Sequence, residues 1–392
     1  MQRYSKRLSW LLAPNRQSQL VAEMRRQGTP ILDLTGSNPT SAANYPHALI
    51  RQAFTELNNF TYNPEPGGLL DAREAVSGFH QAEGFNAHPS RILFTASTSE
   101  AYSLLFKLLC DAGDEVLVPS PSYPLFEYLG NAELVRIVPY RLHYDGSWSI
   151  DFDHFRRQLS VRSRAVIIVN PNNPTGSFLK KQEVEQLVQL SRAYQLPIIS
   201  DEVFMSYPFG NDTRGVRSLV GEDRVLSFSL NGMSKAAGMP QMKLAWIVVN
   251  GPAEDCAAAQ ERLELLFDTY LSVSTPVQLA APSLLSIGGA VRKQLQEKTM
   301  QNVQHAQEAF RDSPVSVLHT EGGWSVILRL PATQTEERWI EELLTDQNLL
   351  LHPGFFFDMP GGGAYAIASL IAEPDEFAEG IARLNDYVVR HC

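Results

Sequence analysis

A single lysine, Lys235, lies in the run SLNGMSKAAG (229–238) among small and apolar neighbours. No acidic residue occurs in this run to form an ion pair with it. A lysine in such surroundings is either a solvated loop residue or an amine held in a dry site. A dry site favours the neutral amine, which is the nucleophilic form of lysine.

Three further segments carry residue types that could act together with this amine. TASTSE (95–100) opens a helical pattern with small hydroxyl residues, where backbone N–H groups and the helix dipole favour an anion such as phosphate. NPNNPTG (170–176) is a proline-rigid turn that presents amide side chains. Asp201 follows the apolar run LPIIS. Taken singly, these segments read as a helix N-cap, a plain turn and a cap of the next helix.

The same segments follow short apolar runs that have the length and composition of buried strands. These runs are RILFTA (91–96), EVLVPS (115–120), RAVIIVN (164–170), LPIISDEV (196–203), RVLSFSL (224–230) and LAWIVVNG (244–251). We expect a helix after each of the first four, as in SEAYSLLFKLLCDAG and KKQEVEQLVQLSRAYQ. The alternation predicts an α/β fold with a mostly parallel central sheet between helix layers. In such a fold, functional residues gather where strands end.

Near residue 276 the pattern changes and predicts a second, smaller α+β domain. A long helical stretch begins there, and the alternating run SVILRLP (325–331) and a helix over 335–348 follow. We expect three parts: an N-terminal arm (1–44) that packs with the small domain, a large domain (45–276) and the C-terminal small domain (277–392).

Composition argues against several classes of function. The 392-residue chain has a formal net charge of -10, which disfavours a nucleic-acid or anionic-membrane partner. No run approaches about 18 apolar residues, so we expect no membrane span. Cys110, Cys256 and Cys392 are far apart, which is typical of reduced thiols in the cytoplasm. The histidines lack metal-ligand spacing, and we expect no metal.

Considered together, the four chemical segments fit one ligand. A phosphate site, an amide donor, an acid and a lone lysine occur in that order on successive strand ends. Pyridoxal phosphate offers a partner to each of them, namely a phosphate, a phenolic oxygen, a pyridinium nitrogen and an aldehyde. The sequence therefore predicts pyridoxal 5'-phosphate as the cofactor.

From about residue 30 to its end, the chain resembles the class I and II aminotransferases of pyridoxal-phosphate fold type I. The resemblance rests on NPNNPTG, on the strand end Asp201-Glu202-Val203 and on the pair Ser234-Lys235. It implies that Lys235 holds the cofactor as a Schiff base and shuttles a proton during the reaction. The implied activity moves an amino group from an amino acid, or a related amine, to a 2-oxo acid.

The resemblance also implies roles for residues that contact the ring and the substrate. Asp201 would pair with the pyridinium nitrogen and keep it protonated. Asn173 would donate to the phenolic oxygen, and Tyr123 would stack on the ring. Gly36 in LTGSNPT and Trp324 in EGGW match substrate positions of the family, as does Asn173.

The phosphate group has its own set of matching positions. They are Ser97, Thr98, Ser99, Lys243 and Tyr62. Tyr62, in TYNPEPGG, resembles the tyrosine that reaches the phosphate of the neighbouring subunit. The resemblance therefore implies a homodimer in which the two subunits share their active sites.

The sequence departs from the family pattern at three positions. Phe204 stands where a tyrosine usually gives a second hydrogen bond to the phenolic oxygen, and Lys243 replaces an arginine. Ile367 aligns with the arginine that binds the substrate carboxylate. Another cation, such as Arg16 or Arg136, could take over that contact. Alternatively, the substrate is an amine or modified amino acid, or the protein transaminates poorly.

Two other functions are compatible with the same motifs. A pyridoxal-phosphate-dependent C–S lyase would use the same constellation and differ only in its leaving group. A non-catalytic protein that binds pyridoxal phosphate is the second alternative. Because the lysine, acid, amide and aromatic residue are all present, the sequence favours catalysis.

Overall fold

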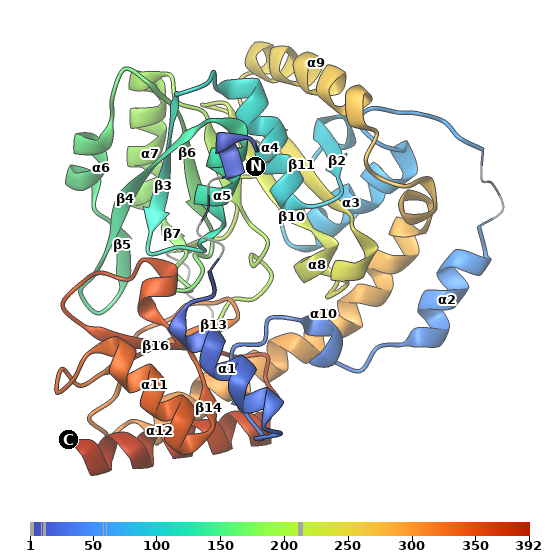
Figure 1. Ribbon diagram of the computed structural model, residues 1–392. Helices are drawn as coiled ribbons and strands as arrows, with labels where there is room; N and C mark the ends of the chain where they lie inside the picture. Colours follow the sequence, from blue (N-terminus) through green and yellow to red (C-terminus); the bar gives the residue numbers. More distant parts are fainter. Residues whose placement is uncertain (1–3, 9, 11–12, 58, 60, 211–214) are drawn as a thin grey trace.

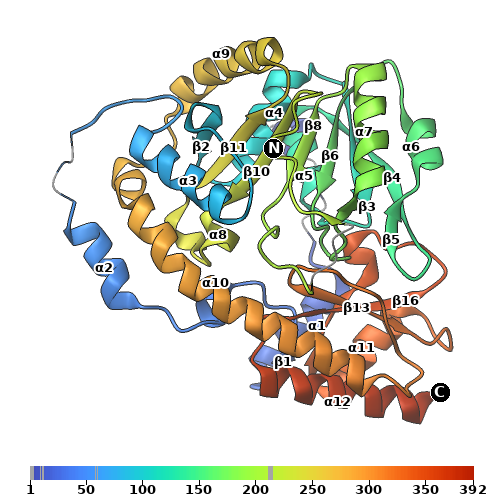
Figure 2. The ribbon, with the colours of Figure 1, turned by 180° about the vertical axis from the view of Figure 1, so that it is seen from behind.

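The computed structural model describes residues 4–8, 10, 13–57, 59, 61–210 and 215–392. The described chain is built around a sheet of eight strands and a second sheet of four strands, each with its own helices (Figure 1). The two units lie one above the other, and the long helix α10 (Thr275–Ala309) passes along both (Figure 2). The start of α10 packs on the larger unit and its end on the smaller one.

The larger sheet has the strand order β2-β11-β10-β8-β6-β3-β4-β5. Neighbours from β10 through β8, β6 and β3 to β4 are parallel, whereas β11 runs antiparallel to β10 and β2, and β5 antiparallel to β4. This arrangement confirms the prediction of a mostly parallel central sheet. The strands are β2 (Ile92–Thr95), β3 (Glu115–Ser120), β4 (Arg136–Tyr144), β5 (Trp148–Ile150), β6 (Ser163–Val169), β8 (Ile198–Asp201), β10 (Ser227–Gly232) and β11 (Ala245–Asn250).

Both faces of this sheet are covered by helices, which explains why its strands are continuous apolar runs. In β6, Ala165, Ile167 and Val169 pack toward one helix layer, whereas Val166 and Ile168 pack toward the other. The first layer contains α4 (Thr98–Leu109), α5 (Leu125–Glu133) and α9 (Ala253–Tyr270). The second contains α6 (Phe152–Gln158), α7 (Lys181–Tyr194), α3 (Leu70–Ala82) and the start of α10, with α2 (His47–Thr55) beside them.

The smaller unit is an antiparallel sheet of order β12-β13-β16-β15. Its apolar core lies against α11, α12 and the end of α10. Helix α1 packs against α11, and β1 pairs in parallel with β14 beside this unit. The bounds are α1 (Arg16–Arg26), β1 (Leu32–Asp33), β12 (Ser316–Val317), β13 (Ser325–Leu330), α11 (Glu336–Gln347), β14 (Leu349–Leu350), β15 (His352–Pro353), β16 (Ala364–Ser369) and α12 (Pro374–His391).

The prediction of a helix directly after the run 196–203 is wrong. After β8 the chain makes turns up to Gly210, the last described residue before position 215. Glu202, at the start of these turns, is buried and accepts a hydrogen bond from the Leu219 backbone N–H at 2.8 Å. The segment is therefore held inward by its contacts, and Pro208 and Gly210 disfavour a helix at its far end.

Three further elements are short. The strands β7 (Leu179–Lys180) and β9 (Gly215–Val216) pair with each other, and the single-turn helix α8 (Met233–Ala236) contains Lys235. Among the described helices, none is both long and apolar enough to cross a membrane.

Candidate functional site

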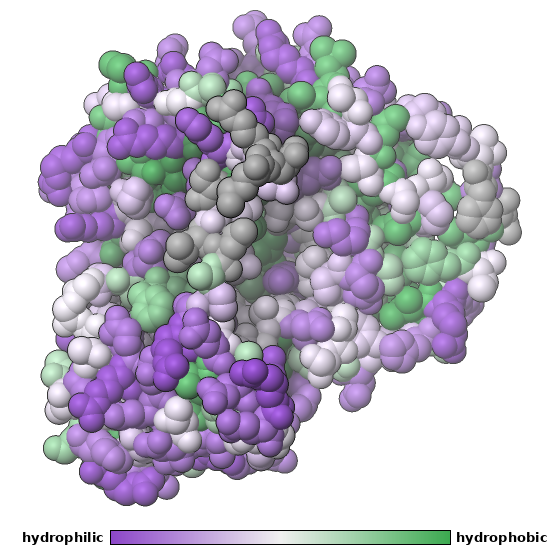
Figure 3. Space-filling view, viewed as in Figure 1, coloured by the Kyte–Doolittle hydropathy of each residue, from purple (hydrophilic) through white to green (hydrophobic). Residues whose placement is uncertain are grey.

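The chemical residues found in the sequence lie at one edge of the larger sheet. Asp201 ends β8 and is the register partner of Leu230 in β10, which leads directly into α8 with Lys235. Val169, the last residue of β6, is the register partner of Asp201 on its other side. Because these strands are parallel, the acid, the amine and the Asn-Pro turn follow carboxyl ends that meet at the same edge. Figure 3, viewed as Figure 1, shows a recess in the molecular surface between the two units.

Lys235 lies in an aromatic and largely dry environment. Its Nζ is 5.1 Å from the ring centre of Trp324 and 5.7 Å from that of Phe204. Burial lowers the pKa of Lys235 below its usual value, and the nearby charge of Asp201 opposes this shift. The site thus favours a neutral amine more than water would.

Asp201 is a desolvated acid that is held by two donors. Burial raises the pKa of Asp201, whereas a hydrogen bond from Tyr102, the Val203 N–H and the charge of Lys235 lower it. The Tyr102 hydroxyl donates to Oδ2 at 2.9 Å, and the Val203 N–H donates to Oδ1 at 3.2 Å. Sequence reasoning missed Tyr102, although it lies in α4 only a few residues after the hydroxyl cluster TASTS.

The predicted phosphate residues form the N-terminus of α4. Ser97 is the N-cap, and its side chain accepts a hydrogen bond from the Glu100 N–H at 3.2 Å. Thr98 and Ser99 occupy the first turn, where backbone N–H groups lack partners within the helix. Lys243 is exposed, in the left-handed backbone conformation with φ 51°, two residues before Ala245, the register partner of Thr95 at the start of TASTSE (95–100). The α4 terminus thus offers N–H groups and hydroxyls to an anion.

The three asparagine side chains of the turn NPNNPTG have different partners: two bond to backbone groups, and the third bonds to a side chain. Asn170 accepts from the Leu179 N–H at 2.9 Å, and Asn172 donates to the Pro121 carbonyl at 3.2 Å. Asn173 instead accepts a hydrogen bond from the Ser325 hydroxyl at 3.2 Å through its Oδ1. With its oxygen engaged, the Asn173 amide nitrogen remains available as a donor.

Three other predicted site residues lie at the margins of this arrangement. Tyr123 is 46% exposed, in the loop between β3 and α5. Gly36 accepts from the Ser369 hydroxyl through its carbonyl, so it lies beside β16. Tyr62 is 67% exposed and lies outside both sheets, between α2 and α3.

Ile367, which aligns with the carboxylate-binding arginine of the family, has apolar surroundings in the structure. Ile367 is 1% exposed and is the register partner of Ile327 in β13. Both belong to an apolar cluster shared by the two units, together with Phe357 and Leu179. In the apolar run FFF (355–357), Phe357 is buried, whereas Phe355 is half-exposed.

The two cations considered for the carboxylate contact are both paired elsewhere. Arg16 lies in α1, with a side chain 64% exposed, 3.9 Å from Glu341. Arg136 has a side chain 71% exposed and lies 3.0 Å from Glu115. Trp324, by contrast, is buried, and its Nε1 has no hydrogen-bond partner within the described part of the chain. A buried neutral donor therefore lies beside Lys235, whereas the two arginines form ion pairs elsewhere.

Three side chains that sequence reasoning missed hold the carbonyl groups around Lys235. The Tyr207 hydroxyl donates to the Lys235 carbonyl at 2.8 Å, and Arg292 donates to that of Ala236 at 3.0 Å. The Tyr45 hydroxyl donates to the Gly238 carbonyl. These donors come from three distant parts of the chain, so no local pattern identifies them.

Comparison with known proteins agrees with this geometry. Residues 29–370 match the model of the family "Aminotransferase class I and II". The chain belongs to the class I and II aminotransferase family. Its cofactor is therefore pyridoxal 5'-phosphate, and its reaction is transamination.

Curated relatives of this aminotransferase cover most of its length. Glutamate-pyruvate aminotransferase AlaA of Escherichia coli is 24% identical over 356 residues, which are 88% of this chain and 88% of that protein. Alanine aminotransferase of Mycobacterium tuberculosis is 24% identical over 387 residues, which are 95% of this chain and 89% of that protein.

Solved structures show the same fold. Alanine aminotransferase from Pyrococcus furiosus has a TM-score of 0.88 at 24% identity and covers 99% of this chain and 100% of its own. A Thermus thermophilus aspartate aminotransferase mutant has a TM-score of 0.84 at 20% identity and covers 98% and 100%. Both support pyridoxal-phosphate fold type I for this aminotransferase.

The described residues fit this cofactor. The structure provides a desolvated amine in Lys235, a desolvated acid in Asp201 and a helix N-terminus at α4. The buried Ser122 hydroxyl, next to Tyr123, also has no hydrogen-bond partner among the described residues. When bound, pyridoxal phosphate supplies an aldehyde and an electron-withdrawing ring.

Proposed function

We propose that Lys235 holds the cofactor covalently through its amine, as a Schiff base, and moves protons during transfer of the amino group. The observation that carries this proposal is the desolvated Lys235 amine in α8, which follows β10, the strand paired with the end of β8 at desolvated Asp201. A neutral amine is needed to attack an aldehyde and to accept a proton from a carbon atom. The small residues around Lys235 leave room for the ring of the cofactor.

The other site residues are proposed to bind and orient the cofactor. Asp201 binds the pyridinium nitrogen, Asn173 donates to the phenolic oxygen, and Tyr123 stacks on the ring. The N-terminus of α4, with Ser97, Thr98 and Ser99, binds the phosphate, and Lys243 adds a positive charge there. Phe204 offers no hydroxyl group for a second hydrogen bond to the phenolic oxygen.

An amino acid is the proposed donor and a 2-oxo acid the acceptor, as the names of the relatives suggest. Neutral groups replace a carboxylate-binding arginine in this proposal. The donors are the Asn173 amide, Trp324 Nε1 and the backbone at Gly36. Support comes from the unpartnered Nε1 of Trp324 and from the ion pairs that hold Arg16 and Arg136 elsewhere.

We further propose that the enzyme acts in the cytoplasm as a homodimer with shared active sites. Exposed apolar side chains support a second copy as partner, because Leu49, Leu70, Leu265 and Tyr270 are each about half-exposed or more. In the dimer, Tyr62 reaches the phosphate of the neighbouring subunit. The proposed division into an arm (1–44), a large domain (45–276) and a small domain (277–392) places the site between the two domains.

Replacing Lys235 with Ala tests the proposal. We expect Lys235→Ala to lose the visible absorption of covalently bound cofactor and to lower kcat by more than ~1000-fold, because no other amine takes its place. Absorption spectra and formation of the new amino acid measure the two effects. Lys293→Ala, which removes an exposed lysine of α10, is the control.

Near-normal turnover by Lys235→Ala would contradict the assignment. If the wild-type protein instead cleaves a C–S bond and forms no new amino acid, the lyase alternative replaces transamination. Binding of pyridoxal phosphate without any turnover across a panel of amino acids and amines would favour the non-catalytic alternative.

A further inference from the structure

The segment 320–325 leads into β13 of the smaller sheet, but several of its polar contacts are with loops of the larger unit. The Glu321 N–H donates to the Gly176 carbonyl at 3.2 Å, and the Glu321 carbonyl accepts from the Phe209 N–H at 2.7 Å. The Gly323 N–H donates to the Tyr207 carbonyl at 2.9 Å. This segment, the docking segment, thus lies between the Asn-Pro turn and the turns after β8.

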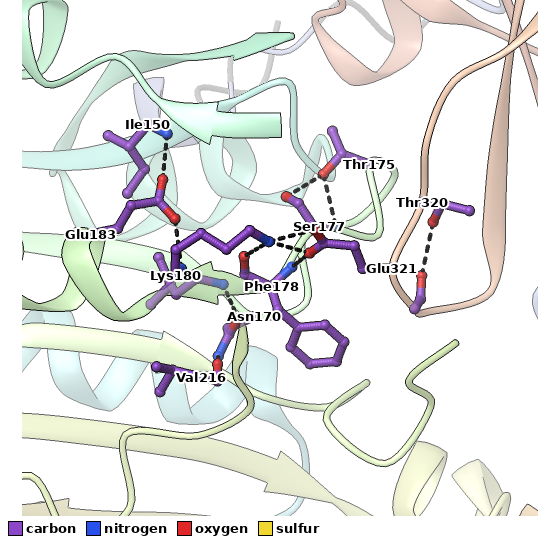
Figure 4. Close-up of polar contacts among 12 residues, drawn as sticks. Ile150, Asn170, Thr175, Ser177, Phe178, Lys180, Glu183, Val216, Thr320 and Glu321 are labelled. Atoms are coloured by element: carbon purple, nitrogen blue, oxygen red, sulfur yellow. Dashed lines mark hydrogen bonds and ion pairs between the residues drawn. The ribbon is translucent and has the colours of Figure 1, made fainter. Parts of the chain in front are cut away.

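A buried ion pair joins the docking segment to the chain just after the Asn-Pro turn (Figure 4). Lys180 Nζ lies 2.5 Å from the Glu321 carboxylate, and the two side chains are 22% and 9% exposed. The same carboxylate accepts the Phe178 N–H at 2.7 Å, and Lys180 Nζ donates to the Phe178 carbonyl at 2.8 Å. Glu321 therefore binds both a cation and the backbone of the strand that follows the turn.

The Lys180 end of this pair is itself fixed. Its backbone N–H donates to the Glu183 carboxylate at 2.7 Å, and Glu183 also accepts from the Ile150 N–H at 2.7 Å. Asn170 accepts from the neighbouring Leu179 N–H. Figure 4 shows these contacts side by side with the ion pair. Lys180 thus belongs to a part of the larger unit whose backbone is fixed by several hydrogen bonds.

The docking segment and the Asn-Pro turn are in close contact. Gly176 has φ +69°, and a Cβ atom there would lie 1.9 Å from Thr320 Oγ1 and 2.3 Å from the Gly322 carbonyl oxygen. Gly322 in turn approaches the Tyr207 carbonyl, since a Cβ on it would lie 2.5 Å from that oxygen. Glycine at both positions lets the backbones meet without side chains between them.

Two residues of the docking segment reach the proposed site. The Trp324 ring centre is 5.1 Å from Lys235 Nζ, and the Ser325 hydroxyl donates to Asn173 at 3.2 Å. Both follow Glu321 within four residues, so a displacement of Glu321 moves them. The position of the docking segment therefore sets the orientation of the Asn173 amide and the position of the Trp324 ring beside Lys235.

We propose that Lys180 and Glu321 are positioning residues for the amino-transfer site. Their ion pair sets the docking segment against the Asn-Pro turn and thereby sets Asn173 and Trp324 relative to Lys235. This inference rests on the proposed function of that site. Neither residue touches the reacting atoms, and the effect passes through Ser325 and Trp324.

Glu321→Gln is the first test. The amide keeps an oxygen for the Phe178 N–H but loses the charge that attracts Lys180, which leaves an uncompensated cation in a mostly buried position. We expect kcat/KM to fall on the order of tenfold or more, because small displacements in a site are costly, and Kd for pyridoxal phosphate to rise severalfold. Kinetics and titration of cofactor-free protein with pyridoxal phosphate measure these effects.

Three companion variants separate positioning from stability. Lys180→Arg keeps the cation and should retain most of the activity. Ser325→Ala removes only the hydroxyl that contacts Asn173, and we expect it to lower kcat/KM with little change in melting temperature. Glu185→Gln removes one partner of an exposed ion pair with Arg224, 2.8 Å long, and should leave all readouts at wild-type values.

The results distinguish this inference from the proposed function. If the wild-type protein transaminates while Glu321→Gln and Ser325→Ala are folded and match its kcat/KM and Kd, the positioning role is wrong and the function stands. A lower melting temperature with unchanged kinetics and cofactor binding also overturns it, because that pattern is purely structural. If Lys235→Ala remains active, the function itself fails.

Discussion

At the scale of single residues, burial and charge oppose each other at the centre of the site. Burial alone favours neutral forms, and it lowers the pKa of Lys235 and raises that of Asp201. A bound pyridinium cation needs the carboxylate form of Asp201. The hydrogen bond from the Tyr102 hydroxyl favours that form, because it stabilises the charged oxygen. With the role proposed above for Asp201, Tyr102 supports cofactor binding through this contact.

Tyr102→Phe is expected to weaken cofactor binding without disturbing packing. Loss of the donor raises the pKa of Asp201 further, so Kd for pyridoxal phosphate should rise about tenfold, which corresponds to a hydrogen bond to a charged group. The rise should become larger as the pH is lowered, because protonation of Asp201 competes with binding at low pH. Titration of the cofactor-free protein at several pH values measures it.

Tyr140→Phe is the matched control for this variant. Tyr140 is also buried, but its hydroxyl donates to the Ile167 carbonyl at 2.9 Å instead of an acid. Equal effects of Tyr140→Phe and Tyr102→Phe on Kd, or an effect of Tyr102→Phe that does not vary with pH, would remove the specific role of the Asp201 contact.

At the scale of elements, the helix that carries Lys235 is too short to be stable alone. α8 has four residues, and a single helical turn costs more backbone entropy than its few hydrogen bonds return. The carbonyl groups of Lys235, Ala236 and Gly238 receive donors from Tyr207, Arg292 and Tyr45 instead. Tertiary contacts therefore hold α8 in place.

Tyr207→Phe tests this support. The variant keeps the ring, which packs 5.1 Å from Trp324, but removes the shorter of two hydrogen bonds to the Lys235 carbonyl and leaves the one from the Gly238 N–H at 3.3 Å. We expect the free energy of unfolding to fall by about 1 kcal/mol, since one buried hydrogen bond is lost. Urea unfolding measures the change, and Tyr194→Phe, which alters an exposed tyrosine of α7, serves as control. Equal stability of the Tyr207→Phe variant and the wild type would mean that α8 does not need this bond.

At the scale of the whole molecule, a buried histidine links α3 to the larger sheet and makes stability depend on pH. His80 is 1% exposed, and its Nε2 accepts from Trp246 Nε1 at 3.0 Å. Burial lowers the pKa of His80 from 6.5 to about 4. Between these values the unfolded chain binds more protons than the folded one, so stability decreases as pH falls from 6.5 toward 4.

His80→Gln should remove this pH dependence and keep an acceptor for Trp246. Relative to the variant, the wild type should lose about 3 kcal/mol of unfolding free energy between pH 6.5 and pH 4, because one pKa unit corresponds to about 1.4 kcal/mol. Urea unfolding of both proteins across this range gives the difference. A difference that stays constant with pH would show that His80 does not titrate as described.

The apolar runs of the larger sheet were predictable because each is a local pattern. All six runs overlap strands that lie where expected, and only the helix expected after the run 196–203 was wrong. The strands β4 and β5 were not identified. β5 lies at the edge of the sheet and β4 next to it. One face of β4 is exposed, so it carries polar residues such as Arg141 and His143, which interrupt the apolar signal.

The sequence by itself determined the cofactor, the family and the residues at the strand ends, because each of these depends on short motifs and their order. Only the tertiary structure decided which side chains support them. Lys180 and Glu321 are 141 residues apart, and Tyr102 and Asp201 are 99 apart. Such contacts depend on how helices and sheets pack, and packing arises from many weak interactions across the whole core that no short pattern contains.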